Sequence, residues 1–316
     1  MTPTSPSNDH LESDLHAART HAASEFALLP ETAEEFGIAW VDPAVERVDD
    51  GEISAVRWGT GDVDVVLLHG AGQNAHTWDA VLLALSARGE VTAMAIDLPG
   101  HGRSPWRDDH DYGPERNATA VGGFLTRAGV DPRVVVGMSL GGLTAIALGR
   151  AGTRQVGRVL VDVTPSSAER AASMSRESRD ATILMEGPRD FASLGEMVDA
   201  THAASPTRSR AAIRRGVLHN AAPGDDGRWR WRYDVPARFD PTSLWGSVIT
   251  PGVHTTVVRG SRSAFVDEED VARLRAADPT VDVIEVEDAG HSVQGDQPIA
   301  LAGILHAVID RISHPS

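Results

Sequence analysis

The segment that most constrains the fold is residues 133–142, Arg-Val-Val-Val-Gly-Met-Ser-Leu-Gly-Gly. Its three consecutive valines predict a buried strand, and the Ala- and Leu-rich residues 143–149 predict a helix. Ser139 lies on the sharp turn between them, where side chains at positions 137 and 141 would clash, and both positions are glycine. Such a turn projects the Ser139 hydroxyl above the edge of the sheet, as a nucleophile requires.

Strand and helix patterns alternate on both sides of this turn. A hairpin is predicted around residues 49–52, and further strands are predicted at 63–68, 91–96, 159–163, 254–258 and 281–286. Helices are predicted at 77–87, 114–128, 267–276 and 298–312. This order predicts an α/β fold, with a mostly parallel sheet and helices on both faces. Active sites in such sheets lie beyond the carboxyl ends of the strands, where Ser139, Asp162 and His291 are expected.

The alternation of strands and helices is interrupted once, and we use this interruption to divide the chain into a core and an insertion. Residues 165–246 contain helix-like patches at 169–186, 190–204 and 207–219 and end in an aromatic stretch. We expect them to be inserted into a core made of residues 41–164 and 247–316. Residues 1–40 are expected to form an N-terminal arm, disordered over 1–10 and helical over 11–29.

Composition excludes several classes of function. The formal net charge of −16 argues against a nucleic-acid partner. The chain has no lysine, which excludes Schiff-base chemistry, and no cysteine, which excludes a thiolate nucleophile and a thiolate metal site. We expect neither a metal nor a cofactor. No signal peptide and no long apolar run is apparent, so a cytoplasmic protein without a membrane partner is expected.

Two further features complete a candidate nucleophilic site. His291 lies in a short loop after the last predicted strand, from which its imidazole could take the Ser139 proton. An oxyanion hole is expected from the backbone N–H groups of Leu140, next to the nucleophile, and of Ala71, in a Gly-rich loop after the third strand. That loop lacks the third glycine of a dinucleotide fingerprint, and no P-loop lysine exists, so phosphate binding is not expected.

Together these motifs resemble those of the α/β-hydrolase superfamily. The resemblance covers about residues 45–313 and is carried by 69–72 (His-Gly-Ala-Gly), 97–104 (Asp-Leu-Pro-Gly-His-Gly-Arg-Ser), 137–141 (Gly-Met-Ser-Leu-Gly) and 289–292 (Ala-Gly-His-Ser). It implies an eight-stranded sheet whose second strand is antiparallel, with a helical cap after the sixth strand. Residues 165–246 would form that cap, and residues 97–104 would form a structural turn beside the site.

The sequence departs from the superfamily pattern at the acid of the catalytic triad. In relatives this acid usually follows the seventh strand, three residues after a glycine, but Ser263 occupies that position here. Asp162, at the end of the sixth strand, resembles the acid of some other members. Asp267 is the alternative, although its acidic surroundings are also typical of a helix N-terminus. We predict Asp162.

The predicted activity is hydrolysis of a small-molecule carboxylic ester through an acyl-enzyme. The cap is less negative than the rest of the chain, which suggests an arginine clamp for a half-ester, such as a monoalkyl ester of an aromatic dicarboxylic acid. The candidate clamp residues are Arg214, Arg215, Arg228, Arg230 and Arg232. The alternatives are a carbon–carbon bond hydrolase acting on ring-cleavage products and a ligand-binding pseudo-enzyme. A homodimer is possible.

Overall fold

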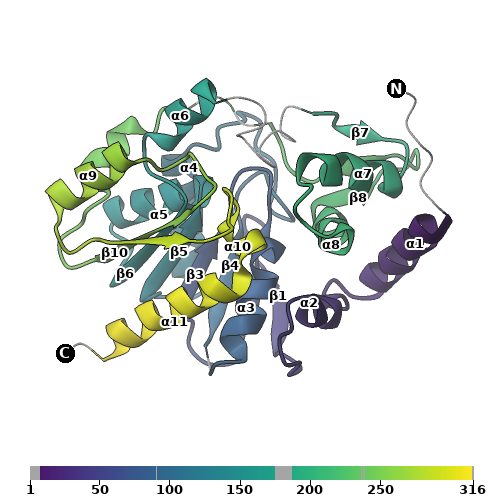
Figure 1. The fold of residues 1–316 in the computed structure, drawn as a ribbon, viewed down its shortest axis with the longest axis horizontal. Coiled ribbons are helices and arrows are strands. Elements are labelled where there is room, and N and C mark those ends of the chain that lie inside the picture. Colours follow the sequence, from purple (N-terminus) through teal and green to yellow (C-terminus); the bar gives the residue numbers. More distant parts are fainter. Residues whose placement is uncertain (1–7, 90, 175–186, 236, 238, 315–316) are drawn as a thin grey trace.

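The chain folds around one eight-stranded sheet (Figure 1). The computed structural model describes residues 8–89, 91–174, 187–235, 237 and 239–314. Across the sheet the strands are β1 (Val45–Asp49), β2 (Ser54–Trp58), β4 (Ala93–Asp97), β3 (Val65–Leu68), β5 (Val134–Met138), β6 (Gly157–Val161), β10 (His254–Gly260) and β11 (Asp282–Val286). Neighbouring strands are parallel except at β2, which is antiparallel to both β1 and β4. The predicted fold class and the antiparallel second strand are therefore confirmed.

Helices cover both faces of this sheet. Helices α3 (Asp79–Ser86) and α11 (Pro298–Ser313) pack on one face, and α4 (Pro114–Arg127), α5 (Leu140–Arg150) and α9 (Glu268–Ala277) pack on the other. Alternate residues of β3 point to opposite faces, so Val65 and Leu67 contact one layer and Val66 and Leu68 the other. Because both layers are apolar, the central strands are continuous hydrophobic runs.

Residues 165–246 contain both helices and strands. They include α6 (Ser167–Ser173), α7 (Leu194–Ala204), α8 (Arg210–Asn220) and the short 3₁₀ helix η3 (Thr242–Ser247). Strands β7 (Asp190–Phe191), β9 (Trp229–Trp231) and β8 (Ala221–Pro223) form a small antiparallel sheet, which the purely helical prediction missed. Most of the predicted helix at 169–186 lies outside the described residues, and we keep the name cap for residues 165–246.

The N-terminal arm forms two helices, α1 (Asn8–Ala23) and α2 (Leu29–Glu35), and residues 1–7 lie outside the described part. Ala17 and Leu28 pack into the apolar cluster of the cap, whereas Leu29 and Ala33 pack against the core. The arm thus contacts both parts of the molecule, and Figure 1 shows α1 beside α7 and α8. Within the described residues, no helix combines the length and apolarity that crossing a membrane requires.

Candidate active site

Ser139 occupies the predicted turn between β5 and α5. Its backbone is left-handed and strained, with φ at 50°, and its N–H donates to the carbonyl oxygen of Val161 at 3.2 Å. A Cβ atom at Gly137 would lie 2.3 Å from the Gly141 oxygen, and one at Gly141 would lie 2.1 Å from the Leu68 oxygen. Both glycines are therefore required by close backbone approach.

A buried histidine–aspartate pair lies beyond the carboxyl ends of β11 and β6. His291 Nδ1 is 2.7 Å from Asp162 Oδ2, and the two side chains are 2% and 0% exposed. Asp162 directly follows β6 in a left-handed conformation with φ at 52°. Its Oδ1 accepts the Gly260 N–H at 3.2 Å, and its Oδ2 also accepts the Ser263 hydroxyl. These two hydrogen bonds fix the orientation of the buried Asp162 carboxyl group against His291.

The other candidate acid is placed elsewhere. The Asp267 carboxylate caps α9 by accepting the Asp270 N–H at 3.0 Å, and it pairs with Arg170 at 2.8 Å. Ser263, at the position where the superfamily usually has its acid, instead donates to Asp162. Of the two candidates, the structure therefore brings Asp162, and not Asp267, against His291.

The second nitrogen of His291 is available for chemistry. Because a carboxylate can only accept, the short Nδ1–Asp162 contact requires the proton on Nδ1, and Nε2 is buried without a hydrogen-bond partner among the described residues. Both His291 and Ser139 line the same cavity. Phe265 stacks on the His291 ring with centroids 3.5 Å apart and fixes its plane. Sequence reasoning missed Phe265, because an aromatic residue in a loop carries no periodic signal.

The loop after β3 approaches Ser139 closely. A Cβ atom at Gly70 would lie 3.4 Å from the Ser139 Cβ, and Ala71 lines the cavity beside it. Leu140 is the first residue of α5, where backbone N–H groups have no partner within the helix. This placement is compatible with the expected oxyanion hole, which remains a prediction for Ala71 and Leu140.

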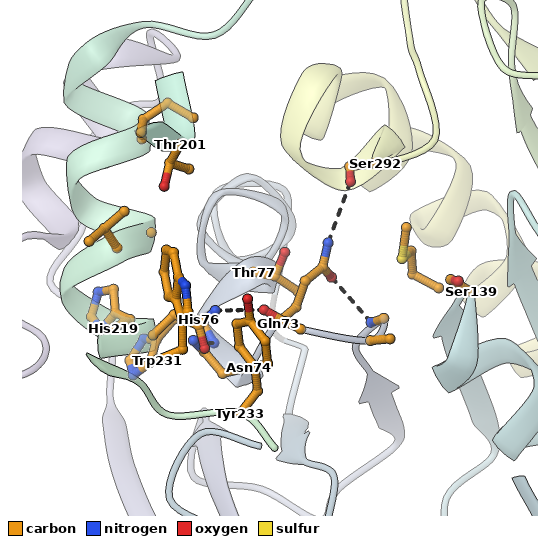
Figure 2. Close-up of a pocket in the computed structure, with 18 of the residues that line it drawn as sticks. Gln73, Asn74, His76, Thr77, Ser139, Thr201, His219, Trp231, Tyr233 and Ser292 are labelled. Carbon is orange, nitrogen blue, oxygen red and sulfur yellow. Dashed lines mark hydrogen bonds between the residues drawn. The ribbon is translucent and has the colours of Figure 1, made fainter. Parts of the chain in front are cut away.

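Gln73 links the two loops that carry the site, as Figure 2 shows. Its Oε1 accepts the Gly70 N–H at 3.1 Å, and its Nε2 donates to the Ser292 hydroxyl at 3.4 Å. The cap adds a further contact, since Asn220 Nδ2 donates to the Gly72 oxygen at 2.6 Å. The sequence offered no signal for either residue, because each acts between segments that are distant along the chain.

His69 links the same loop to the segment after β4 through hydrogen bonds. Its Nε2 accepts the Leu98 N–H at 2.9 Å, and its Nδ1 lies 2.7 Å from the Gly70 oxygen. Complete burial disfavours the imidazolium and lowers the pKa of His69 to about 4, although the Gly70 contact opposes the shift. His69 is thus a neutral structural residue that connects the loop after β3 to the 97–104 turn.

The cavity lies between the Ser139 edge of the sheet and the cap, has a volume of about 180 Å³ and is partly open to solvent. Met138, Ile213, Val217, Trp231 and Tyr233 supply apolar lining. The described lining also includes polar groups from the core, namely Gln73, Asn74, His76 and Thr77. The cap therefore forms one wall and the core the other.

The five arginines proposed as a substrate clamp do not line this cavity. Arg214 and Arg215 pair with Glu31 of the arm at 2.6 and 2.8 Å, and Arg215 also contacts Glu35. The other three lie on or near β9: Arg228 pairs with Asp190, Arg230 with Asp226, and Arg232 donates to the Ala221 oxygen. The local arginine excess is explained by contacts within the cap and with the arm, so the clamp is not supported.

One arginine that sequence reasoning passed over does line the cavity. Arg208 Nε is 2.9 Å from the partly buried Asp296 carboxylate, and its Nη2 is 3.3 Å from the Ser292 oxygen. Its charge is therefore balanced by a carboxylate at the end of the short helix α10 (Val293–Asp296), which follows His291. This ion pair connects the cap to α10.

Comparisons with known proteins agree with this geometry. Residues 65–304 match the sequence model of the alpha/beta hydrolase family. The chain is 48% identical to Esterase Rv0045c of Mycobacterium tuberculosis over 90% of its own length and 96% of that protein. It is also 26% identical to Lipase LipV of the same organism, over 81% of this chain and 97% of the lipase. A solved structure of the Rv0045c esterase, described together with its inhibition by transition metals, has a TM-score of 0.80 and 46% identity over 91% of this chain and 99% of that one. The chain therefore belongs to the α/β-hydrolase family.

Proposed function

We propose that the protein is a serine esterase whose triad is Ser139, His291 and Asp162. The observation that carries the proposal is the buried His291–Asp162 pair, whose unpartnered Nε2 shares a cavity with the strained Ser139. The similarity to the Rv0045c esterase over nearly the whole chain supports the same class of reaction.

The reaction follows from these positions. His291 Nε2 takes the Ser139 proton as Oγ attacks the ester carbonyl carbon, and the carbonyl electrons move to oxygen. The Ala71 and Leu140 N–H groups are the proposed donors to that oxyanion. The imidazolium then protonates the leaving alcohol, and a water deprotonated by His291 hydrolyses the acyl-enzyme. Asp162 keeps the imidazole in the required tautomer and stabilises its positive charge throughout.

We further propose that the preferred substrate is a neutral ester rather than a half-ester. The predicted preference for a half-ester depended on free arginines, but the five candidates contact other groups outside the cavity. Arg208 lines the cavity but is paired with Asp296. Comparing kcat/KM for an aromatic half-ester and its diester tests this point. A half-ester preferred by tenfold or more, equivalent to about 1.4 kcal/mol, would contradict it.

Two measurements separate the esterase from its alternatives. A fluorophosphonate probe should label wild-type Ser139 and leave Ser139→Ala unlabelled, whereas a ligand-binding pseudo-enzyme would not be labelled at all. A panel of nitrophenyl esters beside dienoic ring-cleavage products then tests the bond that is cleaved. Faster turnover of the dienoic compounds would favour the carbon–carbon hydrolase.

A further inference from the structure

The loop after β3 forms a tight turn over residues 70–73. The Gln73 N–H donates to the Gly70 oxygen at 3.2 Å, and Gly72, the third residue of the turn, has φ at 72°. A positive φ at this position is typical of a type II β-turn. Ala71 is the second residue of the turn and carries the N–H that we propose as an oxyanion donor. Among the described residues no group accepts this N–H, so it is free to bind a substrate oxygen.

Asn220 of the cap contacts this turn through its side-chain amide. It is the last residue of α8, and its Nδ2 donates to the Gly72 oxygen at 2.6 Å. A carbonyl oxygen can only accept, so the asparagine must present its NH₂ group, and not its own oxygen, to Gly72. Asn220 is 9% exposed, and both residues line the cavity that Ser139 also lines. The contact therefore connects the cap to the loop after β3 inside the candidate active site.

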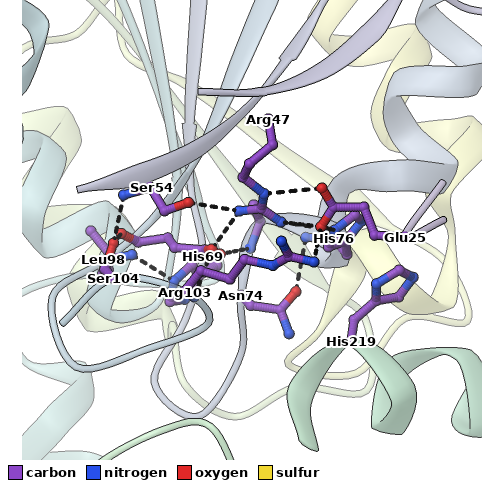
Figure 3. Close-up of polar contacts among 12 residues, drawn as sticks. Glu25, Arg47, Ser54, His69, Asn74, His76, Leu98, Arg103, Ser104 and His219 are labelled. Atoms are coloured by element: carbon purple, nitrogen blue, oxygen red, sulfur yellow. Dashed lines mark hydrogen bonds and ion pairs between the residues drawn. The ribbon is translucent and has the colours of Figure 1, made fainter. Parts of the chain in front are cut away.

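Contacts on both sides of Asn220 hold its backbone in position. Its carbonyl oxygen accepts the Arg232 N–H at 2.8 Å, which joins the end of α8 to the residue after β9. The preceding residue, His219, stacks on His76 with ring centroids 3.7 Å apart. His76 belongs to the 3₁₀ helix η1 (Ala75–Trp78), and Figure 3 shows the two histidines where α8 approaches the core. Asn220 is thus a fixed donor and not a mobile surface side chain.

Two peptide groups connect Asn220 to the proposed oxyanion donor. The Gly72 oxygen, which accepts from Asn220, belongs to the same planar peptide group as the Gln73 N–H. That N–H donates to the Gly70 oxygen, which shares a second peptide group with the Ala71 N–H. The C=O and N–H of a trans peptide point in opposite directions, so a donor that fixes the oxygen also fixes the direction of the N–H. Hydrogen bonds in such a chain polarise one another, which makes the last N–H a stronger donor.

We propose that Asn220 is a positioning residue that aligns the Ala71 N–H for the oxyanion, so that the cap contributes to transition-state stabilisation without touching the reacting atoms. This inference rests on the esterase mechanism proposed above. Ile213 and Val217 of α8 line the same cavity, so a substrate that packs against them also supports the helix that carries Asn220. Because the oxyanion develops only in the transition state, the contact should act on kcat and not on KM.

Two substitutions of Asn220 in the full-length protein test this role with a nitrophenyl ester as substrate. Asn220→Ala removes the donor, and Asn220→Asp keeps the shape but places a second acceptor against the Gly72 oxygen. Loss of a direct oxyanion donor lowers kcat by about 10²–10³-fold, so loss of its support should lower kcat about tenfold in the alanine variant and further in the aspartate variant. KM should change less than about twofold in both.

A trifluoromethyl ketone provides a readout that a purely structural role would not change. Ser139 Oγ adds to the ketone carbon, His291 takes the Ser139 proton, and the ketone oxygen becomes the alkoxide that the oxyanion donors bind. The inhibition constant should therefore rise about tenfold in both Asn220 variants.

Asn117→Ala is the matched control. The Asn117 Nδ2 also donates to a backbone oxygen, that of Tyr112 at 2.9 Å, and in both asparagines Oδ1 is buried without a partner among the described residues. Asn117 lies on α4, outside the cavity. Its loss should lower the melting temperature but leave kcat and the inhibition constant unchanged.

Thermal melts identify the folded variants, and either folded Asn220 variant suffices. Unchanged kcat and inhibition constant would overturn the proposal, and so would a raised KM at unchanged kcat, which would indicate direct substrate binding by Asn220. An equal loss of kcat in Asn117→Ala would indicate a general effect of lost stability and would also overturn it. Fluorophosphonate labelling separates this inference from the mechanism: an unlabelled wild type would contradict the esterase itself, whereas a labelled wild type with unaffected Asn220 variants would contradict only the role of Asn220.

Discussion

Replacing Asp162 by asparagine tests the least conventional element of the proposed triad. The change keeps size and backbone: φ is 52° at this position, and asparagine tolerates the left-handed region as well as aspartate. The substitution removes the negative charge beside His291 Nδ1, 2.7 Å away, in a site that is 0% exposed. An asparagine amide that donates to Nδ1 would also stabilise the wrong tautomer of His291.

The expected cost is large because the charge is unscreened. Loss of the corresponding aspartate in a serine triad slows turnover by a factor of about 10⁴, which corresponds to about 5.5 kcal/mol of transition-state stabilisation. With a nitrophenyl ester as substrate, we expect Asp162→Asn to turn over roughly a thousandfold to ten-thousandfold more slowly than the wild type, at about the same KM. The melting temperature should change little, because the amide retains one acceptor oxygen for the Gly260 N–H.

Asp267→Asn is the matched control, since its carboxylate caps α9 and pairs with Arg170. It should slow turnover less than about tenfold, with a small loss of stability from the weakened cap. Ser263→Ala removes one hydroxyl donor from the Asp162 carboxylate and should slow turnover about tenfold. A loss of roughly a thousandfold in Asp267→Asn, together with near wild-type turnover in Asp162→Asn, would refute our assignment of the acid.

The contacts around the site support three further predictions. Arg215→Ala leaves Glu31 without one of its partners and should lower the free energy of unfolding by about 2 kcal/mol in urea titrations, with turnover unchanged. Altered turnover would instead indicate that Arg215 takes part in substrate binding. Gln73→Ala frees the Gly70 loop and should reduce kcat/KM about tenfold while the melting temperature stays within a few degrees; an unchanged kcat/KM would show that the loop holds without it. Burial lowers the pKa of His69 to about 4 from 6.5, so below pH 6.5 the unfolded chain binds a proton that the folded chain does not. The contribution of His69 to stability should be fully present above pH 6.5 and should be lost toward pH 4 by up to about 1.4 kcal/mol per pH unit, so in denaturant titrations His69→Asn should reduce the pH slope of the unfolding free energy by up to that amount.

Local patterns in the sequence determined most of the fold and the position of Ser139, the proposed nucleophile. Consecutive valines before Gly137 specify a buried parallel strand, and the two glycines around Ser139 are required by backbone contacts within a few residues or with the neighbouring strand. The order of strands and helices then specifies the mostly parallel sheet, because each helix returns the chain to the same edge. The position of His291 followed from the same order of elements. The loop after the last parallel strand begins at the carboxyl edge of the sheet, where Ser139 also lies.

Tertiary structure alone decided the remaining features. Ser263 and Asp162 are adjacent in space but far apart along the chain, so only the register of β6 beside β10 shows that one donates to the other. Composition predicted a basic clamp, but Arg215 is neutralised by the arm, whose docking no local pattern indicates. The cluster of His76 and His219 likewise joins the core to the cap. Side-chain contacts between separately folded segments depend on how those segments pack, and that information is absent from periodicity and spacing along a single chain.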